Sequence, residues 1–275
     1  MTPDGRISGR TWSGAPLAGR RVVVLGAAGE VGEGVVRRLR AFGAHVIAVS
    51  RAADRLARLE RAAMLETGGH GPGTLATQVG DVGREDGAMR LRETMAARHG
   101  PLDAVIASLG GWRQGPAVTD TPWDAWREAL DQSLTAHVLA VRALLPVLAD
   151  RAGASYTLIN GGAALHPVPG AGAMCVSAAG QLMLAHVLAA EHRGRAVRVN
   201  TLVLSTPVRT RSRPVGREEW ISADDAGTHA AYLASDAAAA VRGATVVLDH
   251  PNATRDLPPP FGSSGGAEAR PGGTS

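Results

Sequence analysis

The sequence predicts an α/β fold in which a parallel sheet of seven strands is covered by helices on both faces. The first observation behind this prediction is that short apolar runs alternate with segments of helical periodicity along most of the chain. Such alternation is typical of parallel sheets with right-handed crossovers. The second observation is the stretch 21–38, where four apolar residues are followed by glycines and then by a helix-like pattern. That order indicates a buried strand, a tight turn and a helix.

The glycines of this turn predict an anion-binding site. Gly26, Gly29 and Gly32 follow the strand at a spacing of three. Glycines let the backbone approach a pyrophosphate closely, while the free N–H groups of the next helix point toward it. An ordinary strand-to-helix turn is the alternative, but the order of strand, glycines and helix favours a dinucleotide.

The remaining elements are expected in regular succession. Strands are predicted at 22–25, 45–49, 74–79, 102–107, 155–160, 198–204 and 244–248. After the helix that follows the glycines, further helices are predicted at 54–64, 83–99, 121–150, 171–192 and 223–236, with a glycine-rich loop at 67–73. The helices over 121–150 and 171–192 are apolar on more than one face, which indicates burial on both sides.

Composition predicts one globular domain over residues 18–250, between a flexible arm at 1–17 and a Pro/Gly-rich flexible tail at 251–275. The chain of 275 residues has no run of 18 apolar residues and no basic-then-apolar leader. We therefore expect a cytoplasmic protein with no membrane partner. A single cysteine, Cys175, excludes an intrachain disulfide and a cysteine-rich metal site, and no metal is predicted.

The charge pattern argues against a nucleic-acid partner. The net charge is +4, and all 29 basic residues are arginines scattered over many segments, because the chain contains no lysine. Two tyrosines and two phenylalanines offer no platform for base stacking. A small-molecule substrate is expected instead.

The end of the second strand bears on the choice of cofactor. In a dinucleotide fold an acidic residue there binds the ribose 2′-hydroxyl and repels a 2′-phosphate. This chain carries Ser50 and Arg51 at that position, so NADP(H) is favoured over NAD(H), although NAD(H) stays possible. The alternative is that Arg51 is a solvated arginine at a helix start.

Taken together, these residues resemble the short-chain dehydrogenase/reductase family, whose fold is of the Rossmann type, from about residue 19 to residue 249. The resemblance is carried by the three glycines, Ser50-Arg51, Asp81-Val82, the stretch Ala107-Ser108-Leu109-Gly110 where the family has Asn-Asn-Ala-Gly, Arg198-Val199-Asn200, and Tyr232-Leu233-Ala234-Ser235-Asp236. The resemblance implies that Asp81 and Val82 lie against the adenine and that Ser108 and Gly110 border the cofactor. It also implies a homodimer or homotetramer formed through the two long helices.

The glycine spacing departs from the commonest family pattern and is closer to the extended and atypical subtypes. Glu30 and Glu33 add two carboxylates near the expected phosphate site.

The largest departures fall on the family's catalytic residues, a tyrosine, a lysine four residues later, a serine and an asparagine. Counting back from 189–191, which resembles the usual end of the catalytic helix, places Met174 at the tyrosine and Ala178 at the lysine. The serine position falls on Gly161 or Gly162, and the asparagine position on Ser133. The two tyrosines, at 156 and 232, fall elsewhere, so the usual proton relay is absent.

Several side chains could replace the missing relay. His166 follows the fifth strand, and its imidazole suits proton transfer near neutral pH. Asn160 could donate to an oxyanion, and Ser133 could share a proton with His137 one helical turn away. Cys175 and Ser177 point elsewhere around the helix. The expected substrate pocket comprises Trp112, Arg113, Gln114, His166 and Met174. Each of these residues also has a plain packing or surface interpretation.

Three functions are compatible with this pattern. The first is an NADP(H)-dependent oxidoreductase whose substrate does not need the missing acid, for example an imine or iminium. The second is a redox-neutral cyclase, lyase or isomerase that holds a reactive intermediate in the same pocket. The third is a non-catalytic cofactor-binding or partner subunit. The retained cofactor residues and the polar and aromatic side chains of the expected pocket together favour the oxidoreductase.

Overall fold

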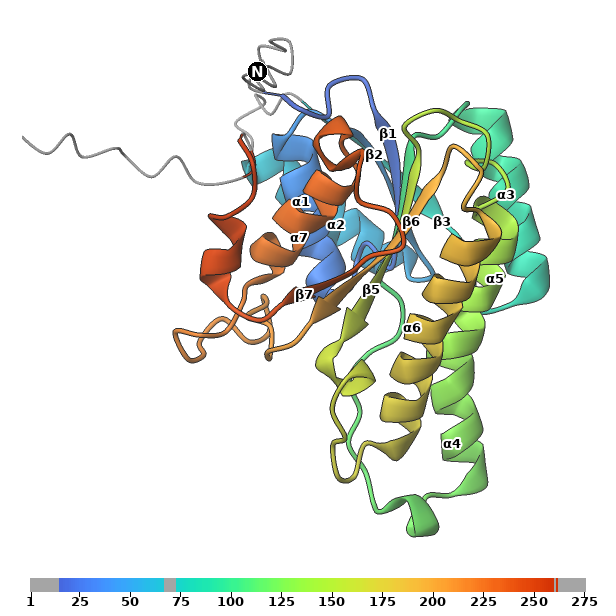
Figure 1. Ribbon diagram of the computed structural model, residues 1–275, viewed down its shortest axis with the longest axis vertical. Coiled ribbons are helices and arrows are strands. Elements are labelled where there is room, and N and C mark those ends of the chain that lie inside the picture. Colours follow the sequence, from blue (N-terminus) through green and yellow to red (C-terminus); the bar gives the residue numbers. More distant parts are fainter. Residues whose placement is uncertain (1–14, 67–72, 260, 262–275) are drawn as a thin grey trace, which may run out of the picture.

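The computed structural model describes residues 15–66, 73–259 and 261, and it confirms the predicted fold class (Figure 1). Seven parallel strands form one sheet in the order β3-β2-β1-β4-β5-β6-β7. The strands are β1 (Arg21–Leu25), β2 (His45–Ser50), β3 (Thr74–Val79), β4 (Ala104–Ala107), β5 (Ser155–Gly161), β6 (Arg198–Leu204) and β7 (Thr245–Leu248). The strand order reverses between β1 and β4, which makes the sheet doubly wound.

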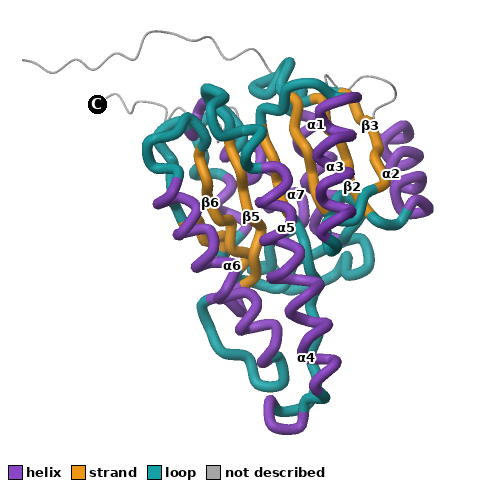
Figure 2. Tube along the Cα trace, turned by 90° about the vertical axis from the view of Figure 1, so that its right-hand side faces the viewer, coloured by secondary structure: helices purple, strands orange, loops and turns teal. Residues whose placement is uncertain are grey.

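Helices cover both faces of the sheet, as Figures 1 and 2 show. One layer comprises α1 (Glu30–Ala41), α2 (Ala53–Glu66) and α7 (Ala223–Leu233), and the other comprises α3 (Glu85–Arg98), α5 (Ala136–Leu144) and α6 (Gly172–Glu191). Strand β1 supplies both layers: Val22 and Val24 belong to the first apolar core, and Val23 and Leu25 to the second. This alternation is why a strand buried on both faces is apolar throughout.

The prediction of one uninterrupted helix over 121–150 is wrong. The chain forms α4 (Trp123–Leu130), one π-helical turn (Asp131–Thr135) and then α5. Regular helix ends at Leu144, because Pro146 has no N–H to donate to the carbonyl of Arg142. Helix α4 projects beyond the end of the sheet (Figure 1).

The predicted flexible ends are wrong where the structure describes them. Leu17 is fully buried in the core beside α1, and its N–H donates to the carbonyl of Phe42 at 2.9 Å. In the tail, Pro251–Thr254 form a 3-10 turn, and the ring of Phe261 is buried between Phe42 and Tyr232. The arm at 1–14, the loop at 67–72 and the tail at 260 and 262–275 lie outside the described residues.

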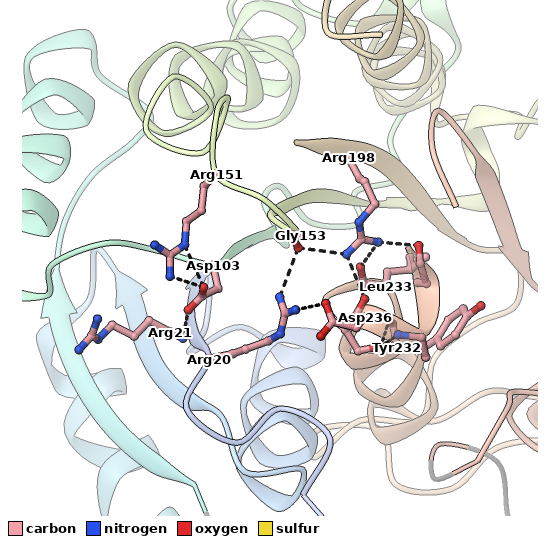
Figure 3. Close-up of polar contacts among 12 residues, drawn as sticks. Arg20, Arg21, Asp103, Arg151, Gly153, Arg198, Tyr232, Leu233 and Asp236 are labelled. Carbon is pink, nitrogen blue, oxygen red and sulfur yellow. Dashed lines mark hydrogen bonds and ion pairs between the residues drawn. The ribbon is translucent and has the colours of Figure 1, made fainter. Parts of the chain in front are cut away.

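A buried arginine ties β6 to the end of α7 (Figure 3). The guanidinium of Arg198, 1% exposed, donates to the carbonyls of Leu233, Ser235 and Ala238 at 2.8–3.1 Å. Arg20 pairs with Asp236 beside it. Burial and the nearby charges of Arg20 and Arg242 lower the pKa of Arg198 to about 10, which leaves it charged at neutral pH. The bond to Leu233 satisfies a carbonyl at the end of α7 that has no helical partner, and the bonds to Ser235 and Ala238 hold the segment that follows the helix.

Helix α6 is predominantly apolar, with a mean hydropathy of 1.6 in its most apolar window. Within the described part of the chain it is the one helix long and apolar enough to cross a membrane. In the structure it packs against β5, β6 and α4, and Ala178, Ala185 and Leu188 are buried. Two valines and one methionine on its other side, Val176, Val187 and Met183, remain exposed.

Candidate cofactor and substrate site

The glycine turn between β1 and α1 has the shape that a pyrophosphate requires. Gly26 has a φ of +72°, and a Cβ at this position would lie 2.0 Å from the carbonyl oxygen of Ser108. A Cβ on Gly32 would lie 2.2 Å from the carbonyl oxygen of Gly26. Gly29 is the N-cap of α1 and offers no side chain to its N–H groups. The cradle therefore needs glycine at 26 and 32, and it leaves the helix N-terminus available to an anion.

The next two strands end beside this turn. The hydroxyl of Ser50 accepts the N–H of Ala52 at 3.3 Å and so helps to start α2. Arg51 is exposed, and its guanidinium has no hydrogen bond or ion pair among the described residues. After β3, the carboxylate of Asp81 accepts the N–H of Gly83 at 2.9 Å, and Val82 is buried. The carboxyl ends of parallel strands share one edge of the sheet, so these residues border the glycine turn.

The loop after β4 closes the other side of the cofactor site and contacts the π-helical turn. The N–H of Ser108 donates to the carbonyl of Leu25 at 3.0 Å. Gly110 has a φ of +93°, and a Cβ there would lie 2.8 Å from the hydroxyl of Ser133. Ser133 and His137 are both buried, Ser133 against Gly110 and His137 beside the backbone of Leu109. Ser133 and His137 are thus buried between the π-helical turn and the loop after β4.

The residues predicted at the family's tyrosine and lysine positions lie in the first two turns of α6. Met174 is half-buried and Ala178 is buried. The side chain of Asn160, near the end of β5, is bonded to two backbone groups. Its amide nitrogen donates to the carbonyl of Ala178 at 2.8 Å, and its oxygen accepts the N–H of Gly161 at 2.8 Å. In this structure Asn160 clamps β5 to α6. Tyr156 is fully buried in the amino-terminal half of β5, and burial raises the pKa of its hydroxyl.

Two loops at this edge are joined to each other. Gly115 donates its N–H to the carbonyl of Gly170 at 2.6 Å, and the amide of Gln114 donates to the carbonyl of Pro169 at 3.0 Å. These bonds connect the loop after β4 to the loop that carries His166. The side chain of His166 is exposed, and its backbone N–H donates to the carbonyl of Gly162 at 3.0 Å.

The two remaining pocket candidates are placed differently. Trp112 is 57% exposed on the loop after β4. The side chain of Arg113 is bonded to the helix beside the loop: its guanidinium donates to Glu128 at 3.2 Å and to Gln132 at 2.7 Å. That arrangement makes it part of the contact between the loop and α4. No group of three or more potential metal ligands occurs among the described residues.

One contact at the candidate cofactor site has no signal in the sequence. Arg211, on the loop after β6, pairs with Glu30 and Glu33 in the first turn of α1. Burial raises the pKa of Glu30, but hydrogen bonds from Thr210 and Ser212 and the charge of Arg211 outweigh it, so the pKa lies below its usual value. The two carboxylates were visible in the sequence, but their partner lies about 180 residues away and left no local signal.

The fold and the site define a dinucleotide-binding α/β protein. Comparison with known proteins gives the family: the model of a family described as enoyl-(acyl carrier protein) reductase matches residues 26–250. The chain belongs to the short-chain dehydrogenase/reductase family, and it is an oxidoreductase of that family with a cofactor-binding Rossmann fold.

Named relatives agree with this assignment. The bovine dehydrogenase/reductase SDR family member 4 is 29% identical over 247 residues, which cover 85% of this chain and 87% of the relative. The cis-2,3-dihydrobiphenyl-2,3-diol dehydrogenase of Paraburkholderia xenovorans is 32% identical over 151 residues, about half of each chain (53% and 52%).

Solved structures show the same fold. A short-chain dehydrogenase/reductase from Mycobacterium ulcerans superposes with a TM-score of 0.77 at 26% identity, over 86% of this chain and 90% of its own. A Pseudomonas aeruginosa short-chain oxidoreductase, described as NADPH-bound and as containing an atypical catalytic center, superposes with a TM-score of 0.75 over 84% and 96%. The latter is 24% identical, a likeness that shows the fold alone.

Proposed function

We propose that this protein is an NADP(H)-dependent reductase that acts on a small molecule, with an imine or iminium as the favoured substrate class. The observation that carries the proposal is the replacement of the relay on α6: Met174 and Ala178 cannot transfer protons, and the carbonyl of Ala178 is bonded to Asn160. The bound nicotinamide would supply the hydride. The chain's own residues would then bind, orient and shield the substrate.

An iminium suits a site without a proton donor. Its nitrogen already carries the proton, so hydride addition to carbon yields a neutral amine directly. A ketone treated in the same way yields an alkoxide that must be protonated. Because a positioned general acid contributes about 10²–10⁴-fold, ketone reduction is the reaction that loses most in this chain.

The preference for NADP(H) rests on Arg51. This guanidinium is exposed, has no partner in the described structure, and follows the strand whose end meets the adenosine ribose. A charged hydrogen bond to the 2′-phosphate contributes about 1.5–3 kcal/mol, roughly 10- to 150-fold in affinity.

Calorimetric titration with NADPH and NADH tests this preference. We expect wild-type protein to bind NADPH more tightly, and Arg51→Ala to remove most of the difference. Arg55→Ala is the matched control, because Arg55 is also exposed and lies one helical turn further along α2. Equal affinity for both cofactors, or no binding of either, would contradict the assignment.

Turnover tests the reaction class. With NADPH followed at 340 nm, we expect cyclic imines to be reduced and ordinary ketones to react poorly or not at all. If His166 supplies a proton, His166→Gln should lower turnover by about 100-fold or more while NADP(H) affinity stays unchanged. His186→Gln, a change at an exposed histidine near the other end of α6, is the control. Brisk ketone reduction would show that another acid has taken over, and product formation without NADPH oxidation would favour a redox-neutral enzyme.

A further inference from the structure

The loop between β6 and α7 folds back on itself and ends in a tight turn. At its base, Arg209 donates its N–H to the carbonyl of Ile221 at 2.8 Å, and Ala223 donates to the carbonyl of Arg209 at 3.0 Å. At its tip, Thr210 and Arg213 exchange both backbone hydrogen bonds at 3.0 and 3.1 Å. Two such bonds hold the intervening pair of residues in a defined turn.

The two residues at the tip contact the first turn of α1. The backbone N–H of Ser212 donates to the carboxylate of Glu30 at 3.1 Å. The guanidinium of Arg211 lies 3.7 Å from Glu30 and 3.2 Å from Glu33. No other cation of the described residues forms an ion pair with either carboxylate. One arginine therefore balances two negative charges.

These carboxylates stand where negative charge opposes cofactor binding. The N–H groups of the first turn of α1 are the ones that would receive a pyrophosphate, and Glu30 and Glu33 belong to that same turn. Carboxylates at a helix N-terminus also offset the partial positive charge of the helix dipole, which would otherwise attract a phosphate. Without a compensating cation, the site would repel the ligand that its glycines accommodate.

We propose that Arg211 is a positioning residue for the dinucleotide, and that it acts by neutralising Glu30 and Glu33 rather than by contacting the cofactor. This inference rests on the proposed NADP(H) binding. It makes the loop after β6 a determinant of cofactor affinity, because the turn at 210–213 brings the guanidinium to both carboxylates at once. Oppositely charged groups within 4 Å of each other largely cancel each other's electrostatic potential at a nearby ligand, even at partly exposed positions such as these.

The test is a charge cycle measured as NADPH affinity by calorimetry at fixed ionic strength. Arg211→Ala should weaken NADPH binding by about tenfold or more, because two unbalanced carboxylates remain beside the pyrophosphate. Arg213→Ala is the matched control: it removes the same charge from the same turn, but its guanidinium lies over the ring of Trp220, 5.9 Å from the centroid. We expect this control to change affinity by less than about threefold.

The second half of the cycle removes the carboxylates. The double variant Glu30→Gln/Glu33→Gln should bind NADPH at least as tightly as wild type, and adding Arg211→Ala to it should change affinity by less than about threefold. An equal loss in both backgrounds would show that Arg211 contacts the cofactor directly and would overturn the inference, as would unchanged affinity of Arg211→Ala alone. If wild-type protein binds no NADPH, the proposed function fails first, and this inference falls with it. Arg211 is largely exposed, so its variants should fold, and thermal unfolding without ligand verifies this.

Discussion

His137 shows how one buried side chain constrains the chemistry near the site. It is fully buried four residues after Ser133, and neither ring nitrogen has a hydrogen-bond partner among the described residues. Burial, opposed by the nearby backbone of Leu109, lowers its pKa from 6.5 to about 4. The imidazole is therefore neutral at pH 7, and protonating it costs free energy. His137 is consequently a poor proton donor near neutral pH, which favours the proposal that His166 takes this role instead.

We expect this burial to make the protein sensitive to acid. Between about pH 6.5 and pH 4 the unfolded chain binds a proton at His137 and the folded chain does not, so the free energy of unfolding falls as the pH falls through this range. The full shift corresponds to about 3 kcal/mol. Urea unfolding of wild-type protein and His137→Leu at pH 7, 5.5 and 4.5 measures it. The variant should lose less stability on acidification, and parallel curves would contradict the account. Part of the slope should persist in both proteins, because burial also lowers the pKa of His229.

At the scale of elements, most of the architecture was predictable because its signals are local. Each strand is a short apolar run bounded by glycine or polar residues, and all seven lie within two residues of the predicted bounds. The π-helical turn left no such signal, since the apolar spacing along 126–145 fits an uninterrupted helix equally well. Phe261 stands alone in a Pro/Gly-rich segment without periodicity, so its burial depends on long-range packing that composition does not encode.

The candidate site also combines features that have a local signal in the sequence with features that have none. The glycine cradle was predictable from the sequence, because it depends on residue type at a fixed spacing. The positions predicted for the relay on α6 rest on the same kind of local count. The partners of the loop arginines were not visible. Arg113 meets Glu128 and Arg211 meets Glu33 only because of the paths that their loops take through space.

The burial of Phe261 predicts that the segment after β7 contributes to the stability of the fold. The ring of Phe261 lies 4.9 Å from that of Phe42 and 5.8 Å from that of Tyr232, and its side chain is 3% exposed. Phe261→Ala should lower the free energy of unfolding by about 3 kcal/mol, as the loss of a buried aromatic ring does, and Phe261→Leu should lose less. Val215→Ala, at a residue 84% exposed, is the control and should change stability by less than about 0.5 kcal/mol. Denaturant unfolding of the three variants would show whether the tail is part of the folded unit.

At the scale of the whole molecule, the exposed side of α6 stands out as an apolar surface without a partner. Val176, Met183 and Val187 are 49%, 61% and 44% exposed and recur at helical spacing along one stripe. Trp123, on the neighbouring α4, is 68% exposed. Both helices lie on the same side of the molecule (Figure 1). An exposed apolar stripe of this kind marks an interaction surface. We propose that a second copy of the chain covers it, as the family resemblance implies.

Charge placed in this stripe should separate the copies. Wild-type protein should elute in light-scattering chromatography at twice the chain mass of 28.2 kDa or more. Met183→Asp should shift it to the monomer mass, because an unpaired carboxylate in an apolar interface loses its hydration without gaining a partner. Met89→Asp makes the same chemical change on α3, at a residue 41% exposed, and should leave the mass unchanged. A wild-type monomer that binds neutral phosphatidylcholine vesicles through α6, and loses this binding in Met183→Asp, would instead assign the stripe to a lipid surface, which the length and hydropathy of the helix also permit.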